Sequence, residues 1–205
     1  LPGGDRAVMV PRRAALGALY DIAPDDARAA AAGWFPPATL ETLLAMLARG
    51  VRSPRTTSVG RLFDVVAALA GLRTRAGYEG QAAMAVEFAA ETASRDAGTY
   101  PLPLLDGEPA VGDWGPLLRA LADDMARGVP AATACARFHE ALADFASAVA
   151  ARVGLPRVVL SGGCFQNALL TARIRARLEG AGFRVFCPRL VPPNDGGIAL
   201  GQAWV

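Results

Sequence analysis

Lysine is absent from this sequence of 205 residues, and charge of one sign never accumulates in it. The 21 basic residues are all arginine and face 19 acidic residues, so the net charge is only +2. This balance argues against nucleic acid or an anionic membrane as the main partner. No uninterrupted apolar run approaches the ~20 residues that span a bilayer. Residues 1–5 also lack the charged and apolar parts of a signal peptide, and we expect a cytoplasmic protein.

Cysteine is scarce as well. Cys135, Cys164 and Cys187 are an odd number, widely spaced and without a Cys-x-x-Cys pair. Neither a disulfide framework nor a four-thiolate zinc site is therefore expected within this chain. Hydrophobic residues make up 53% of the sequence and charged residues 20%, which excludes a disordered tail and predicts a sizeable core. Because the chain opens without methionine on a turn-like Pro-Gly-Gly, we expect a piece of a longer protein.

Helical periodicity dominates residues 1–153. The spacing of apolar residues predicts helices near 12–20, 40–47, 59–70 and 81–89, and two strongly periodic helices over 114–127 and 131–153. Residues 100–111 differ, because they combine prolines and glycines with the turn sequence Asp106-Gly107. They predict a short β-hairpin.

The last fifty residues predict a βαβ unit. Residues 157–161 are a compact β-branched run typical of a buried strand, and 183–187 predict a second strand beside it and parallel to it. A Gly-Gly loop and a helix over 165–179 connect them. A second glycine loop, 192–197, precedes a final helix from Ile198. We expect an α/β fold in one lobe, 1–205, mostly helical over 1–153, with a nucleotide-binding end over 154–205 in which strand 157–161 lies centrally.

Both glycine loops follow the carboxyl ends of the predicted strands, where open α/β sheets bind ligands. Bare glycines let backbone amides approach an anion, and the helix that each loop opens adds partial positive charge. Gly162 and Gly163 therefore predict a phosphate site, and Asp195 in the second loop predicts a divalent metal ligand. A plain tight turn, or a helix cap for Asp195, is the alternative. The loops match neither Walker A, which needs lysine, nor the Gly-x-Gly-x-x-Gly pattern.

Several segments together resemble one known family. They are residues 1–5, 57–69, 78–84, 158–167 and 188–203, including Ser161-Gly162-Gly163-Cys164-Phe165-Gln166-Asn167 and Pro192-Pro193-Asn194-Asp195-Gly196-Gly197. The sequence closely resembles the C-terminal end of HypF-type carbamoyltransferases, which are hydrogenase maturation proteins. The resemblance covers the whole chain. It implies the family's last domain, which is similar to threonylcarbamoyl transferases, and so a helix-rich lobe of the actin-like ATPase (ASKHA) fold with a short, mainly parallel sheet.

The resemblance also implies an enzyme. A carbamoyl-adenylate made from carbamoyl phosphate and ATP would pass its carbamoyl group to the C-terminal cysteine of HypE, toward the cyanide ligands of nickel–iron hydrogenase. The family needs a His-x-x-x-His element, zinc-finger-like motifs and an adenylate-forming domain. This chain contains none of them and only one histidine, His139, so it would supply about half of the active cleft. The divalent metal is left open between magnesium and iron, with zinc only in the upstream domains.

Site residues follow from the same resemblance. Gly162, Gly163 and Asn167 would hold the nucleotide phosphates, and Asp195 the metal. Gly60 and Asp64 would lie near the ribose. The rest of the nucleotide cleft would be lined by Glu79, Gly80 and Gln81. No catalytic residue is assigned.

Each of these residues has a plainer interpretation. Asp64 is alternatively a solvated helix acid, and Glu79 a capping acid. Cys164 lies at a helix N-terminus, where the pKa of a thiol can fall, although the acceptor thiol would belong to HypE. We interpret His139 and the tryptophans, Trp34, Trp114 and Trp204, as packing residues. The whole-chain alternative is a non-catalytic helical docking module that retains an actin-like lobe.

Overall fold

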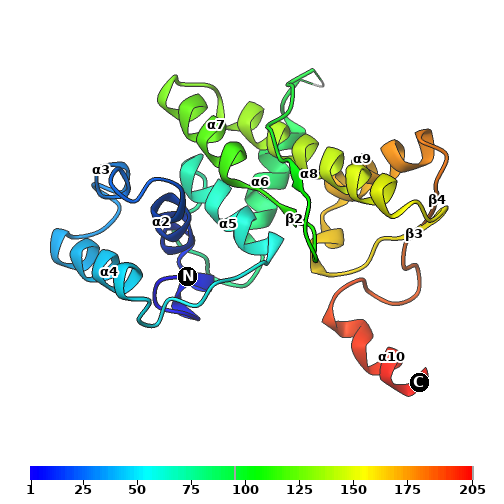
Figure 1. The fold of residues 1–205 in the computed structure, drawn as a ribbon, viewed down its shortest axis with the longest axis horizontal. Coiled ribbons are helices and arrows are strands. Elements are labelled where there is room, and N and C mark those ends of the chain that lie inside the picture. Colours follow the sequence, from blue (N-terminus) through cyan, green and yellow to red (C-terminus); the bar gives the residue numbers. More distant parts are fainter. Residues whose placement is uncertain (95, 205) are drawn as a thin grey trace.

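The computed structural model describes residues 1–94 and 96–204, and helices dominate it (Figure 1). The helices are α1 (Arg6–Met9), α2 (Pro11–Ile22), α3 (Ala27–Ala30), α4 (Pro37–Arg49), α5 (Val59–Leu69), α6 (Gln81–Glu91), α7 (Gly115–Ala126), α8 (Ala131–Val153), α9 (Ala168–Gly180) and α10 (Ile198–Trp204). Two short 3-10 helices, η1 (Gly163–Gln166) and η2 (Asp195–Gly197), follow the two strands of the C-terminal part. No described helix combines the length and the apolarity that crossing a membrane requires.

The core forms between successive helices. α2 packs on α5, α5 on α6, α6 on α8, and α8 on α9, so that α8 runs through the middle of the molecule (Figure 1). Phe63 of α5 and Phe138 of α8 meet edge to face, with ring centroids 4.8 Å apart, and both are almost fully buried. Burial of each such ring contributes about 1.5–3 kcal/mol. This packing fixes α5, which carries Arg61 and Asp64, and α8, which carries His139 and Glu140.

Two small sheets complete the fold. β1 (Leu104–Leu105) pairs antiparallel with β2 (Val111–Gly112), which confirms the predicted hairpin. β3 (Arg157–Val159) pairs parallel with β4 (Arg184–Phe186), with Val158 opposite Val185. η1 and α9 connect β3 to β4, so the predicted βαβ unit is confirmed as well.

The strand β3 is not buried as the sequence predicts. Val159 is 68% exposed and Phe186 of β4 is 44% exposed, whereas Val158 and Val185, on the opposite face, pack against the core. The described helices therefore cover one face of this sheet only. The predicted central position is also wrong here, because the described sheet has just two strands.

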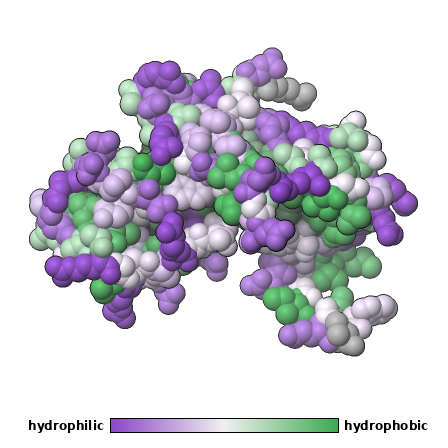
Figure 2. All heavy atoms as spheres, viewed as in Figure 1, coloured by the Kyte–Doolittle hydropathy of each residue, from purple (hydrophilic) through white to green (hydrophobic). Residues whose placement is uncertain are grey.

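The C-terminal segment projects from the helical body (Figure 1). α10 packs mainly on η2, and it leaves Ile198, Leu200 and Trp204 exposed. Figure 2 shows apolar residues on the surface of this projecting end. The packing role predicted for Trp204 is therefore wrong, since the residue is 89% exposed, whereas Trp34 and Trp114 do pack against the core.

Candidate nucleotide site

The loop between β3 and α9 has the geometry of an anion cradle. Gly162 has φ 106° and ψ 160°, a conformation that side chains exclude, and its N–H donates to the carbonyl of Pro193 at 2.7 Å. That bond joins the first glycine loop to the second, as the parallel strand order predicts. Among the described residues, no acceptor takes the N–H of Gly163 or that of Cys164. Two neighbouring backbone donors are therefore free to bind an anion.

Gly163 is not required by the backbone. Its φ lies outside the left-handed region, and a Cβ placed on it would meet no atom within 4 Å. The fold would thus accept a side chain at this position. A close approach by a ligand to the free N–H groups explains a glycine here better than a tight turn does.

The N-terminus of α5 lies against this loop. α5 contacts η1, and the backbone of Gly60 acts on the thiol of Cys164, whose pKa it lowers. Ser58, which precedes α5, makes no side-chain hydrogen bond to the helix end. Residues about a hundred positions apart thus meet at one place, and it is the place at which the family resemblance implies a ribose and its phosphates.

Asp64 is buried rather than solvated. Its residue is 3% exposed, and its Oδ2 lies 2.7 Å from Nη1 of Arg61. Burial raises the pKa of Asp64 to about 7, the Arg61 charge opposes that rise, and Glu79 adds to it. A buried acid with so strongly perturbed a pKa is typical of a functional site. Arg61 is not among the predicted site residues, although its i,i+3 spacing from Asp64 is that of a helical ion pair.

The loop before α6 supplies the third side of the site. Glu79 approaches Arg61, with 3.8 Å between Oε1 and Nη2, and it makes no cap on α6. Gly80 directly precedes α6 and has φ 83°, so the backbone itself requires this glycine. Gln81 closes the loop, because its Oε1 accepts the N–H of Gly77 at 2.7 Å. Glu79 is thus the member of this predicted group with a charged contact inside the site.

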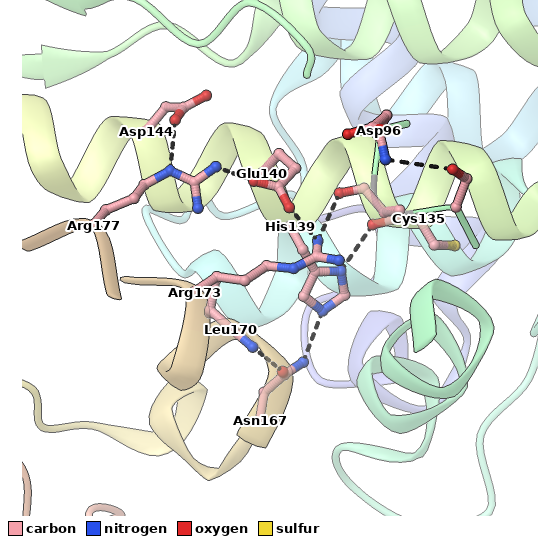
Figure 3. Close-up of polar contacts among 11 residues, drawn as sticks. Asp96, Cys135, His139, Glu140, Asp144, Asn167, Leu170, Arg173 and Arg177 are labelled. Atoms are coloured by element: carbon pink, nitrogen blue, oxygen red, sulfur yellow. Dashed lines mark hydrogen bonds and ion pairs between the residues drawn. The ribbon is translucent and has the colours of Figure 1, made fainter. Parts of the chain in front are cut away.

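Asn167 ends the phosphate loop and anchors it to α8 (Figure 3). Its Oδ1 accepts the N–H of Leu170 at 2.7 Å, which caps α9, and its Nδ2 lies 3.0 Å from Nε2 of His139. The Nδ1 of His139 lies 2.8 Å from the carbonyl of Cys135, which can only accept, so Nδ1 carries the proton and Asn167 donates to Nε2. These contacts fix the loop. The assignment of Asn167 to the phosphates stays a prediction.

Ion pairs hold α9 against α8 beside this anchor (Figure 3). Arg173 contacts Glu140 at 3.0 Å, and Arg177 contacts both Glu140 and Asp144. Because α9 begins directly after Asn167, these pairs also keep the phosphate loop in place. The loop is therefore supported from α8 by buried and surface contacts together.

His139 should make stability depend on pH. Burial lowers the pKa of His139 from 6.5 to about 4, so the unfolded chain binds an extra proton between those values. The contribution of His139 to the free energy of unfolding should therefore be fully present above pH 6.5. The free energy of unfolding should fall by roughly 3 kcal/mol as the pH drops toward 4. Thermal unfolding of the intact protein across this range, compared with His139→Gln, measures it. If thermal stability changes with pH equally in the two proteins, the buried neutral histidine does not cause the pH dependence.

Cys164 does not have the lowered pKa that its place at a helix start predicts. Burial raises the pKa of this thiol, and the Arg61 charge and the Gly60 N–H only partly oppose the rise. The thiol is packed against the core, where the loss of hydration outweighs the helix end. Cys164 is therefore poorly suited to act as a nucleophile.

Asp195 is exposed in the second glycine loop, at the start of η2. The cap of η2 is Asn194, whose Oδ1 accepts the N–H of Gly196 at 3.0 Å, so capping does not account for Asp195. Within residues 1–94 and 96–204, no three His, Cys, Asp or Glu side chains come together as a metal site. The described residues thus form no complete metal centre, and the metal role of Asp195 stays a prediction.

Comparisons with known proteins show what this chain is similar to. Residues 1–202 match the family described as "Carbamoyltransferase, Kae1-like Domain, second subdomain". The carbamoyltransferase HypF of Rhizobium leguminosarum bv. viciae is 40% identical over an alignment of 212 positions, which covers 98% of this chain and 26% of that protein. The carbamoyltransferase HypF of a Synechocystis strain is 36% identical over 98% of this chain and 28% of its own length. The chain thus spans about a quarter of these relatives.

A solved structure has the same fold. Full-length HypF in a phosphate- and nucleotide-bound form superposes with a TM-score of 0.88 at 33% identity, over 99% of this chain and 32% of that one. Sequence and structure comparisons therefore agree on the same family.

Proposed function

The chain belongs to the HypF carbamoyltransferase family, as the second subdomain of its Kae1-like domain, and we propose that it forms the nucleotide-binding side of the transferase. The observation that carries this proposal is the pair of free N–H groups on Gly163 and Cys164 beside the N-terminus of α5. An anion there would gain hydrogen bonds and a favourable helix end at once.

A nucleotide fits the remaining residues of the site. A phosphate would bind the N–H groups of Gly163 and Cys164, and the Asp64 carboxylate would accept hydrogen bonds from the ribose hydroxyls. The solved HypF described as phosphate- and nucleotide-bound supports this class of ligand. A docking module has no need of a bare glycine beside free donors, nor of a buried acid next to them.

The proposed reaction is carbamoyl transfer from carbamoyl-adenylate to a thiol of HypE. The thiolate sulfur attacks the carbamoyl carbon, a carbon–sulfur bond forms, and the bond from carbon to the phosphate oxygen breaks. AMP leaves with the electron pair. The N–H groups of Gly163 and Cys164 would stabilise the charge that develops on its phosphate. The thiocarboxamide product is the proposed precursor of the hydrogenase cyanide ligands.

Asp195 would contribute one oxygen ligand to a divalent cation at the phosphates. The chain brings no second and third acid, cysteine or histidine to this point among its described residues. The other ligands would therefore be phosphate oxygens, water or residues outside this chain.

The proposal is tested by intact mass spectrometry of HypE. Intact enzyme, ATP and carbamoyl phosphate should add one carbamoyl group to HypE, and a HypE variant with alanine for its C-terminal cysteine should gain none. Omission of ATP should abolish the mass gain. Transfer that proceeds equally without a nucleotide would contradict the proposed role of this site.

A further inference from the structure

Arg61 lies at the junction of the proposed nucleotide site. Its Nη1 is 2.7 Å from Oδ2 of Asp64, and its Nη2 is 3.8 Å from Oε1 of Glu79. Its charge also acts on the thiol of Cys164 in the phosphate loop. One guanidinium thus faces acids or a thiol from α5, from the loop before α6 and from η1. The proposed contacts of the nucleotide do not include Arg61.

The contact between Arg61 and Asp64 is electrostatic rather than an aligned hydrogen bond. Nη1 of Arg61 and Oδ2 of Asp64 are both buried, and neither makes a hydrogen bond of good geometry within the described residues. The side chains are 14% and 5% exposed, so water screens the pair weakly. The carboxylate is therefore held by charge, and its hydrogen-bonding capacity is not used up by the arginine.

Removal of the arginine would change the chemistry of the acid. A buried carboxylate without a counter-ion takes up a proton instead of remaining charged. The protonated acid becomes a donor with one acceptor oxygen fewer, and two ribose hydroxyls both need acceptors. Glu79, the other charge that acts on Asp64, would make proton uptake still easier.

We propose that Arg61 is a positioning residue for the nucleotide, because it keeps Asp64 ionised and draws Glu79 to the same side of the site. This inference rests on the proposed function, in which Asp64 accepts the ribose hydroxyls. Arg61 itself need not touch the nucleotide. Its effect should therefore appear in the pH dependence of binding, which a purely structural arginine would not alter.

The test is a calorimetric titration of ATP into the intact protein between about pH 6 and about pH 9. The ATP site of interest is the one that Gly163→Val removes. Affinity of the wild type should rise as Asp64 loses its proton near pH 7. In Arg61→Gln this rise should move up by at least about one pH unit, so that affinity near neutral pH falls at least about fivefold. Arg61→Lys, which retains the charge, should return the profile toward wild type.

Two further variants separate the possible outcomes. Asp64→Asn should bind weakly at every pH, and Arg152→Gln, which removes a surface arginine of α8 paired with Asp106, should match the wild type. A uniform loss of affinity in Arg61→Gln, with an unshifted pH profile, would overturn the inference, and so would a shifted profile in Arg61→Lys. Normal ATP binding by both Gly163→Val and Asp64→Asn would instead overturn the proposed function. If Arg61→Gln does not fold, the test compares the ATP affinity of Arg61→Lys with that of the wild type at the two ends of the pH range.

Discussion

Replacement of Gly163 by valine in the intact protein should lower nucleotide affinity by one to two orders of magnitude without a comparable loss of stability. Residues other than glycine can adopt the backbone conformation of Gly163, and a Cβ there meets no atom within 4 Å. The valine side chain would nevertheless occupy the space through which a phosphate reaches the free N–H groups. Each charge-assisted hydrogen bond lost costs about 1.5–3 kcal/mol, which corresponds to a factor of about ten to a hundred.

Gly162 provides the matched control one residue earlier. Its φ of 106° is strained for any side chain, so Gly162→Ala should lower the free energy of unfolding by about 1–3 kcal/mol. Calorimetric titrations and thermal unfolding of both variants distinguish a glycine needed for ligand binding from a glycine needed for the turn. If Gly163→Val loses affinity and melting temperature together, the glycine serves the turn and the anion cradle is wrong.

The replacement of Asp195 by asparagine should leave the fold in place and abolish metal-dependent carbamoyl transfer. An exposed acid beside a bound phosphate repels it by about 1 kcal/mol, whereas a shared cation makes the same acid attractive. Asn194 already caps η2, so the carboxylate is free for this role. Asparagine keeps the shape of the side chain and removes its charge.

Two measurements test Asp195→Asn. Intact mass of HypE reports transfer, and ATP titrations with and without Mg²⁺ report whether the metal still raises nucleotide affinity. Asp106→Asn is the control and should behave as wild type, because Asp106 is an exposed acid of the β1–β2 hairpin that pairs with Arg152 of α8. Near-normal transfer, or an unchanged effect of Mg²⁺, in Asp195→Asn would leave Asp195 with no part in metal binding.

The topology was predictable where local patterns determine it. Strand, glycine loop, helix and strand within about thirty residues leave few arrangements other than a βαβ unit, and the structure has it. Burial was less predictable, because a β-branched run such as residues 157–161 looks the same whether one face is covered or both. Val159 is exposed because the described helices of this chain cover only the opposite face of the sheet, which carries Val158.

The polar residues of the site show the same division. A carboxylate in mid-helix, as at Asp64, carries no local sign of its burial, which depends on how α5 packs against other elements. The hydrogen bond between Asn167 and His139 joins residues 28 positions apart, and no spacing rule reveals it. The pKa of Cys164 rises because packing outweighs the helix end, and packing is a property of the whole fold. Residue type suggested the chemistry, but only tertiary contacts decided the protonation states.

The sheet of β3 and β4 has a practical consequence for handling the protein. It presents Val159 and Phe186 to water, and each strand has an edge without a strand partner among the described residues. Nearby, Leu190, Leu200 and Trp204 are exposed as well. Open strand edges and exposed apolar side chains favour association between copies of a chain during expression and concentration. We therefore expect this chain by itself to associate with further copies of itself as its concentration rises.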